Sequence, residues 1–297
     1  MARSFAGVDI GRVRAGPVAL ASSYGLAGRD VERAFERGIG FFFWGALRRA
    51  GFGAAVRRLA RRNRERVTIA IQSYARRPWL VRPSVELARL QLGVDAIDVL
   101  GLGFWSAPPP RALVDAALRL RDRGLVRSVV VSSHDRETLA ALLADASLDG
   151  VMVRYNAAHL GAEERVLPLA LERRRPVLAY TATRWGSLLV TPASGEPAPR
   201  GADCYRFALS HPAVGACLAG PKDGAELDGV LEALERGPMT ADELAWMRRV
   251  GAEVRAKGQM RARSGMGPRD VWGHTKGIAR ELWERGLTED LLSRFNR

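Results

Sequence analysis

The sequence predicts an α/β protein built as a (β/α)8 barrel, with accessory helices toward the C-terminal end. Three observations support this fold class. Short apolar runs alternate with amphipathic helical segments eight times, the eight units fit within about 240 residues, and the runs are apolar on both faces. A doubly wound parallel sheet is the competing architecture, but no Gly-x-Gly-x-x-Gly turn follows the first run, as a dinucleotide-binding half of such a sheet requires.

The predicted strands are short and apolar, as buried parallel strands are. In chain order they are residues 18–22, 39–43, 67–73, 97–103, 126–133, 150–156, 176–182 and 214–220. Segments with the helical spacing of apolar residues follow them at 29–38, 52–62, 82–93, 111–124, 136–145, 163–174, 203–211 and 225–237. Gly38, Gly93, Gly124 and Gly237 close four of these segments, which predicts left-handed helix ends there.

Residues 1–240 are therefore predicted to form the barrel, and residues 241–297 to form accessory helices and a tail that packs on it. Thr240 and Glu243 have the spacing of a capping box, in which each side chain accepts a hydrogen bond from the backbone of the other residue. This spacing predicts that an accessory helix begins at Thr240.

The polar tail from residue 258 shows no clear period through residue 275, which predicts a loop, and two short helices follow. Trp272 and Trp283 stand out in this otherwise polar segment. Because large aromatic side chains are commonly buried, we expect the tail to fold against the barrel mouth or to mediate a homo-oligomer.

The composition bounds the function. The formal net charge is +14, but 43 of the 46 basic residues are arginine and they are spread along the chain, so we expect no nucleic-acid partner beyond nonspecific, salt-dependent attraction. No stretch of eighteen apolar residues and no secretory apolar run occurs, which predicts a cytoplasmic protein without a membrane partner. Two cysteines and four histidines lack metal-site spacing, which predicts no metal.

Six fragments, in this order along the chain, resemble the aldo-keto reductase superfamily. They are GIGFFFWG (38–45), LGVDAIDVLGL (92–102), RSVVVSSH (127–134), VMVRYNAAH (151–159), VLAYTATRWGSLL (177–189) and CYRFALSHPAVGACLAG (204–220). The resemblance covers roughly residues 8–250. It implies a TIM barrel whose functional side chains lie at the C-terminal ends of the strands.

The resemblance also implies a chemistry, and here the sequence departs from the family. Its members use a tyrosine as the proton donor, a lysine–aspartate pair that lowers the pKa of this tyrosine, and a histidine that orients the substrate, while NADPH supplies hydride. At the aspartate, tyrosine, lysine and histidine positions this sequence has Phe43, Arg48, Gln72 and Gly103. The resemblance therefore implies a divergent member that lacks this tetrad.

The cofactor site implied by the resemblance is incomplete as well. The residues carried over to it are Ser132, Asn156, Tyr180, Gly220 and Lys222. Lys222 could meet a 2′-phosphate as a point charge, but Glu226 stands near the position of a phosphate-binding arginine. Met152 stands where the family has the glutamine that holds the nicotinamide, and Ser133 stands where it has the neighbouring asparagine. Val230 replaces the asparagine that binds adenine. We expect either no cofactor or residual NADP(H) binding.

Aromatic and arginine side chains follow several predicted strand ends and are expected to converge on the barrel mouth. They are Trp44, Arg48, Tyr74, Trp105, Arg184 and Trp185. This set predicts a small-molecule pocket for a flat or apolar ligand, unless the same residues only fill the space of a lost cofactor. His134 is the one histidine at a predicted strand end, so His134 and Tyr74 are the candidate catalytic residues.

Two functional hypotheses remain open at this point. The first is a barrel that has lost the family's reduction and serves as a pseudoenzyme, a ligand-binding protein or a catalyst of non-redox chemistry. The alternative is a divergent NADP(H)-dependent oxidoreductase acting on a carbonyl substrate, with an acid rebuilt from Tyr24, Tyr74, His134 or Arg48. A nucleic-acid-associated role through the net charge is the third and least favoured hypothesis.

Overall fold

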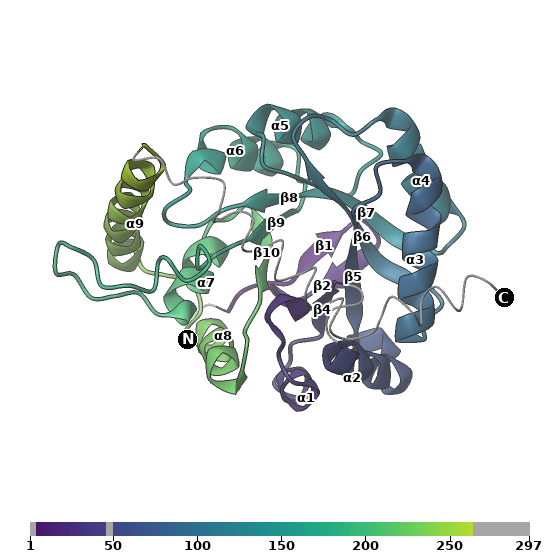
Figure 1. Cartoon of the computed structure of the whole chain (residues 1–297), viewed down its shortest axis with the longest axis horizontal. Helices are drawn as coiled ribbons and strands as arrows, with labels where there is room; N and C mark the ends of the chain where they lie inside the picture. Colours follow the sequence, from purple (N-terminus) through teal and green to yellow (C-terminus); the bar gives the residue numbers. More distant parts are fainter. Residues whose placement is uncertain (1–3, 46–49, 264–297) are drawn as a thin grey trace. The chain divides into compact units, whose positions relative to one another are not determined.

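A computed structural model of the chain describes residues 4–45 and 50–263. Eight parallel strands close into a barrel in the order β10-β3-β4-β5-β6-β7-β8-β9 (Figure 1). They are β3 (Val18–Ala21), β4 (Phe41–Trp44), β5 (Thr68–Ser73), β6 (Ile97–Trp105), β7 (Val126–Ser133), β8 (Gly150–Arg154), β9 (Val177–Tyr180) and β10 (Val214–Ala219). All eight predicted strands are confirmed, and with them the fold class.

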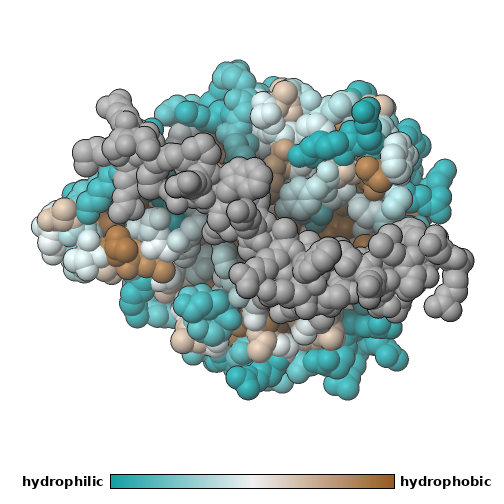
Figure 2. All heavy atoms as spheres, viewed as in Figure 1, coloured by the Kyte–Doolittle hydropathy of each residue, from teal (hydrophilic) through white to brown (hydrophobic). Residues whose placement is uncertain are grey.

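A helix follows each barrel strand, and the eight helices form a ring around the barrel (Figure 1). They are α1 (Gly28–Glu36), α2 (Ala50–Arg62), α3 (Pro78–Leu92), α4 (Arg111–Asp122), α5 (Arg136–Ala144), α6 (Val166–Glu172), α7 (Gly201–Leu209) and α8 (Gly224–Arg236). Most bury one apolar stripe, as α1 does with Val31, Ala34 and Phe35. On the face drawn in Figure 2, hydrophilic side chains surround smaller apolar areas. The four glycines predicted to end helices all have positive φ, but the prediction of a left-handed end is wrong for Gly237, whose ψ is −162°.

A β-hairpin that the sequence analysis missed closes the N-terminal end of the barrel. Its strands β1 (Val8–Ile10) and β2 (Val13–Ala15) pair antiparallel, and Ile10 and Val13 are buried against the inward-facing residues of the barrel. The hairpin turns at Gly11, where φ is +57° and a Cβ atom would lie 2.4 Å from Asp149 Oδ1. Only glycine therefore fits this turn.

The barrel interior is built in layers, because alternate residues of each strand face it. One buried cluster contains the hairpin and the inward-facing residues Phe41, Ala70, Val130, Met152 and Leu178. The residues two positions further along the same strands share this inward orientation and lie nearer the C-terminal ends of the strands. They are Phe43, Gln72, Ser132, Arg154 and Tyr180.

A ninth helix, α9 (Ala241–Arg263), follows the barrel. The predicted capping box is confirmed, with Glu243 N–H donating to Thr240 Oγ1 at 3.2 Å and Thr240 N–H donating to Glu243 Oε2 at 2.8 Å. The loop predicted from residue 258 is wrong for residues 258–263, which continue the helix because they are mostly strong helix formers. By contact density the chain divides inside α9, into residues 1–253 and 254–297.

The remaining tail predictions lie outside the described residues. These are the end of the loop, the two short helices, Trp272, Trp283 and an oligomer through the tail.

Within the described residues, no helix combines the length and the apolar composition needed to cross a bilayer.

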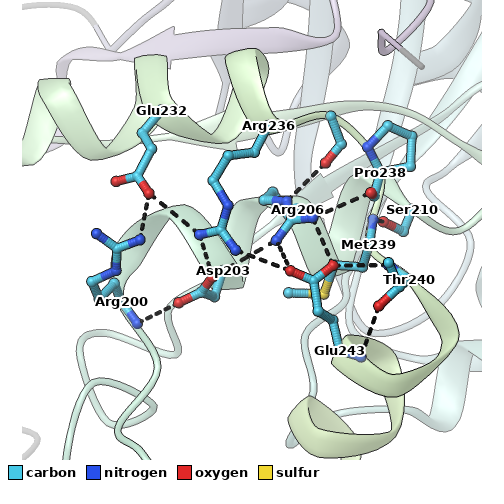
Figure 3. A network of polar contacts seen from close by, with 11 residues as sticks. Arg200, Asp203, Arg206, Ser210, Glu232, Arg236, Pro238, Met239, Thr240 and Glu243 are labelled. Atoms are coloured by element: carbon cyan, nitrogen blue, oxygen red, sulfur yellow. Dashed lines mark hydrogen bonds and ion pairs between the residues drawn. The ribbon is translucent and has the colours of Figure 1, made fainter. Parts of the chain in front are cut away.

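A network of ion pairs joins α7, α8 and the start of α9 (Figure 3). Its centre is Arg206, which is 3% exposed and donates to Glu243 through Nη1 at 2.5 Å and Nη2 at 2.8 Å. Arg206 also donates to the carbonyl oxygens of Gly237 and Pro238, and Arg236 donates to Asp203 and Glu243. These bonds satisfy a buried guanidinium and fix the turn that leads from α8 into α9.

Candidate functional site

Three of the four positions matched to the tetrad come together at the C-terminal end of adjacent strands. Phe43 on β4 packs against the barrel core, and the Gln72 side chain on β5 lies directly over Gly103 on β6. A Cβ atom at residue 103 would lie 2.0 Å from Gln72 Nε2. Gln72 therefore occupies the space that a larger side chain at residue 103 would need. Arg48, the fourth residue, lies outside the described residues.

Beside these residues, four rings form a continuous aromatic cluster. The rings of Phe104 and His134 stack with their centroids 5.1 Å apart and their planes within 8°. Tyr74 lies 5.9 Å from Phe104 on one side, and Tyr180 contacts both Phe104 and His134 edge-on at 5.8 Å. Tyr74 and Phe104 are exposed, so the cluster presents aromatic surface to solvent.

His134 and Tyr180 are also joined by a hydrogen bond of 3.0 Å between His134 Nδ1 and the Tyr180 hydroxyl, which lies 3.2 Å from the Ser133 carbonyl oxygen as well. Burial raises the pKa of Tyr180 to about 12. Partial burial, and secondarily the charge of Arg154, lower the pKa of His134 below its ordinary 6.5. At neutral pH the pair is therefore a protonated phenol and an uncharged imidazole.

Arg154 is a central residue of this end of the barrel, and sequence analysis missed it. It ends β8, and its guanidinium lies over the ring of Trp185, 5.0 Å from the ring centroid. Trp185 belongs to the loop after β9, where Thr181, Arg184 and Trp185 all have positive φ. The strand alternation that points Met152 inward could have identified Arg154, which lies two residues later.

Several buried polar atoms at this end have no hydrogen-bond partner among the described residues. They are Gln72 Nε2, Trp105 Nε1, Ser132 Oγ and Arg154 Nε. Ser132 is fully buried. Since buried polar groups are normally hydrogen-bonded, this concentration marks a place where a ligand could supply partners.

The other residues predicted to line a pocket are placed differently. Trp44 points out of the barrel toward α2, because a Cβ atom on Gly53 would lie 2.8 Å from Trp44 Nε1, so its assignment to the mouth is corrected. The run Phe41–Trp44 is aromatic throughout and gave no alternation from which to assign its faces. Trp105 is half-buried beneath the guanidinium of Arg76, 4.3 Å from its ring centroid.

The residues carried over as cofactor contacts are largely engaged within the protein. Asn156 donates through Nδ2 to the Thr181 carbonyl oxygen at 2.9 Å and accepts from Ala158 N–H at 3.1 Å, so it fixes two loops. The ring of Tyr24 lies against Gly220, where a Cβ atom would be 2.8 Å from Tyr24 Cδ2. Lys222 Nζ pairs with Glu226 Oε1 at 2.7 Å.

These arrangements fit NADP(H) poorly. Lys222 is already neutralised by Glu226, and the Asp223 carboxylate caps α8 beside them by accepting from Glu226 N–H. Two carboxylates and one ammonium leave a net negative charge at this helix start, and this charge opposes a 2′-phosphate. At the other end Met152 offers no hydrogen bond to a carboxamide, and Arg154 would repel the positive charge of an oxidised nicotinamide ring.

Two further features bound the possible chemistry. In the part of the chain that the structure describes, no three His, Cys, Asp or Glu residues are grouped as metal ligands. A cavity of about 520 Å³ lies at the opposite, N-terminal end of the barrel, between residues 4–9, residues 170–176 and the loop that precedes β10. Since TIM-barrel sites occupy the C-terminal face, this cavity is separate from the candidate site.

Comparison with known proteins identifies the class of barrel. No family model and no curated protein matches the sequence. Among solved structures, an aldo-keto reductase from Bacillus halodurans has a TM-score of 0.70 at 19% identity, covering 83% of this chain and 96% of that chain. An aldo-keto reductase from Klebsiella pneumoniae in complex with NADPH has a TM-score of 0.67 at 20% identity, covering 84% and 96%. A glycerol dehydrogenase from Gluconobacter oxydans has a TM-score of 0.65 at 18% identity, covering 84% of this chain and 96% of that chain. The chain therefore has the fold of the aldo-keto reductases.

Proposed function

We propose that this chain is a divergent member of the aldo-keto reductase superfamily that does not carry out carbonyl reduction and binds a small molecule at the C-terminal end of its barrel. One observation carries the proposal. At the three described positions matched to the tetrad, the barrel has Phe43, Gln72 and Gly103, and the Gln72 side chain fills the space above Gly103. None of these side chains can donate a proton or lower the pKa of a phenol by its charge.

The tyrosines near this end of the barrel support the same conclusion. A reductase of this kind needs an acid whose pKa is lowered toward the working pH. Burial raises the pKa of Tyr180 to about 12, and burial together with Glu226 raises the pKa of Tyr24. No described lysine lies on the barrel strands to reverse these shifts.

The alternative is an oxidoreductase with a rebuilt acid, and one observation favours it. The hydrogen bond between Tyr180 and His134 is a contact through which a proton could move. A hydride donor is still required, and the Lys222–Glu226 pair and Met152 give NADP(H) weak support.

The deciding experiment is a titration with NADPH, followed by nicotinamide fluorescence and by the Tm of the full-length chain. With cofactor on the order of 1 mM, we expect no shift in Tm, because a ligand stabilises a fold only where it binds the native state. A panel of aldehydes and ketones should give no consumption of NADPH or NADH, while an active reductase assayed in parallel does. Saturable cofactor binding with substrate-dependent oxidation of NADPH would establish the alternative.

A further inference from the structure

We propose that the C-terminal end of the barrel binds an oxyanion, a carboxylate or phosphate group attached to a flat apolar body, with Arg154 as its charged contact. This inference rests on the proposed function, because it names the class of ligand for the same end of the barrel. It is carried by the charge of Arg154, by unpartnered donors at the same end of the barrel and by the exposed aromatic side chains there.

The first step concerns charge. Arg154 is half-buried at the inward-facing end of β8 and forms no ion pair within the part of the chain that the structure describes. At the opposite, N-terminal end of the barrel, Arg64 pairs with Asp98 at 2.8 Å and Arg121 with Asp149 at 2.9 Å. At the C-terminal end, Arg76 instead donates to the carbonyl oxygens of Gly103 and Phe104. A partly desolvated cation without an anion is unfavourable. An anionic ligand would remove this cost.

The second step concerns the direction of the missing hydrogen bonds. Gln72 Nε2, Trp105 Nε1 and Arg154 Nε can only donate, and the Ser132 hydroxyl can donate as well. Ser132 is fully buried and shares the inward face of the strands with Gln72 and Arg154. The buried side-chain atoms that lack partners at this end of the barrel can therefore all act as donors. A carboxylate or phosphate offers only acceptors and matches these donors.

The third step concerns the apolar part of the ligand. Trp185 is 60% exposed, and Tyr74 and Phe104 are exposed beside the Tyr180–His134 pair. A guanidinium stacked on an indole, as Arg154 is on Trp185, keeps its in-plane N–H groups available for a planar acid. Such rings suit a flat body attached to the anion.

The test uses two pairs of small probes that differ in charge. Benzoate and phenyl phosphate are the anions, and benzamide and benzyl alcohol are neutral compounds of similar shape. Binding to the full-length chain is measured by titration calorimetry at fixed ionic strength. We expect both anions to bind at least about 10-fold more tightly than their neutral counterparts, because each adds a charge-assisted contact. The tighter of the two anions identifies the headgroup.

Variants then assign the contact. Arg154→Met removes the charge while keeping most of the apolar stem, and we expect it to weaken anion binding about 10-fold or more without affecting benzamide. Ser132→Ala should weaken anion binding by about 3-fold to 10-fold through one lost donor. The matched control is Arg119→Gln, an exposed arginine on the outer face of α4, which removes the same charge and should leave affinity within about 2-fold.

Three outcomes would overturn the inference: equal binding of benzoate and benzamide, benzoate affinity unchanged in both the Arg154 and Ser132 variants, or no detectable binding of either anion. None of these outcomes bears on the NADPH titration. In that experiment, cofactor binding with oxidation of NADPH would overturn the proposed function instead. If Arg154→Met lowers the Tm markedly, the Ser132→Ala result and the neutral-probe comparison on the unmodified chain still decide the question.

Discussion

Gln72 and Gly103 are in close contact, since the Gln72 side chain fills the space that a Cβ atom at residue 103 would occupy. A Cβ atom at residue 103 would lie 2.0 Å from Gln72 Nε2 and 2.7 Å from its Cγ. We therefore expect Gly103→Ala to lower the free energy of unfolding by about 1–3 kcal/mol through overpacking. The double variant Gly103→Ala with Gln72→Ala should recover most of this loss, as urea denaturation can measure.

Gly101→Ala is the matched control for that cycle. The same ideal Cβ atom at residue 101 has its nearest neighbours at 3.4 Å, on Ile71 and Met152. Its cost should therefore be smaller than that of Gly103→Ala. Strict additivity of the Gly103 and Gln72 substitutions would contradict a close contact between the Gln72 side chain and residue 103.

Also at the residue scale, the titration of His134 reports directly on Arg154. Partial burial and the charge of Arg154 lower the pKa of His134 in the folded protein. The neutral ring is therefore favoured by folding, and its contribution to stability is present above pH 6.5 and is lost as the pH falls through the folded pKa. Arg154→Met should raise this pKa, measured by NMR titration, because a like charge is removed.

His211 serves as an internal reference in the same spectra. Burial is the main cause of its lowered pKa, and the charged neighbours that act on it are Glu163 and Arg248. Its titration should be unchanged in Arg154→Met. Equal shifts of both histidines would indicate a general change in the fold, and no shift of His134 would show that Arg154 does not face it.

At the scale of elements, α9 is joined to the barrel by the ion pairs of Glu243 with Arg206 and Arg236 (Figure 3). We expect Glu243→Gln to cost about 1–3 kcal/mol, because it leaves the buried Arg206 with a distant carboxylate, Asp203 at 3.9 Å. Hydrogen bonds from Arg206 are the main reason that the pKa of Glu243 falls to about 2. The stabilisation is complete above pH 4.5 and is lost between pH 4.5 and about 2, so wild type and variant should converge there.

Glu235→Gln provides the comparison for this prediction. Glu235 pairs with Arg37 on the surface, with both side chains more than half exposed. Such a pair contributes about 0–1 kcal/mol and is screened by salt. Chemical denaturation of both variants from pH 7 to pH 2 separates the two cases, and an equally small effect of Glu243→Gln would show that the network does not hold α9.

The elements that could be predicted are those with a strong period. The eight barrel strands and the capping box at Thr240 follow from apolar runs and from spacing. The hairpin of Val8–Ala15 did not, because its two strands are three residues long and alternate with charged side chains. Arg154 was missed because it follows three apolar residues, although its position two residues after Met152 places it on the same strand face.

At the scale of the whole molecule, the formal net charge is +14. Many surface arginines are nevertheless paired with carboxylates, as Arg33 is with Asp228 and Arg165 with Glu137. Pairing on the surface leaves the net charge unchanged, so long-range attraction to polyanions persists while no contiguous recognition site is required. We therefore expect retention on heparin at low salt that falls steeply with ionic strength and is gone near physiological salt.

The same retention distinguishes net charge from the proposed anion contact at Arg154. Because polyanion binding is spread over the surface, Arg154→Met and Arg119→Gln should each reduce the salt concentration of elution slightly and equally. Benzoate at a concentration that saturates the barrel end should not displace heparin. A larger effect of Arg154→Met, or displacement of heparin by benzoate, would mean that polyanions bind at the barrel mouth. Binding of duplex or single-stranded nucleic acid at physiological salt would support the nucleic-acid hypothesis.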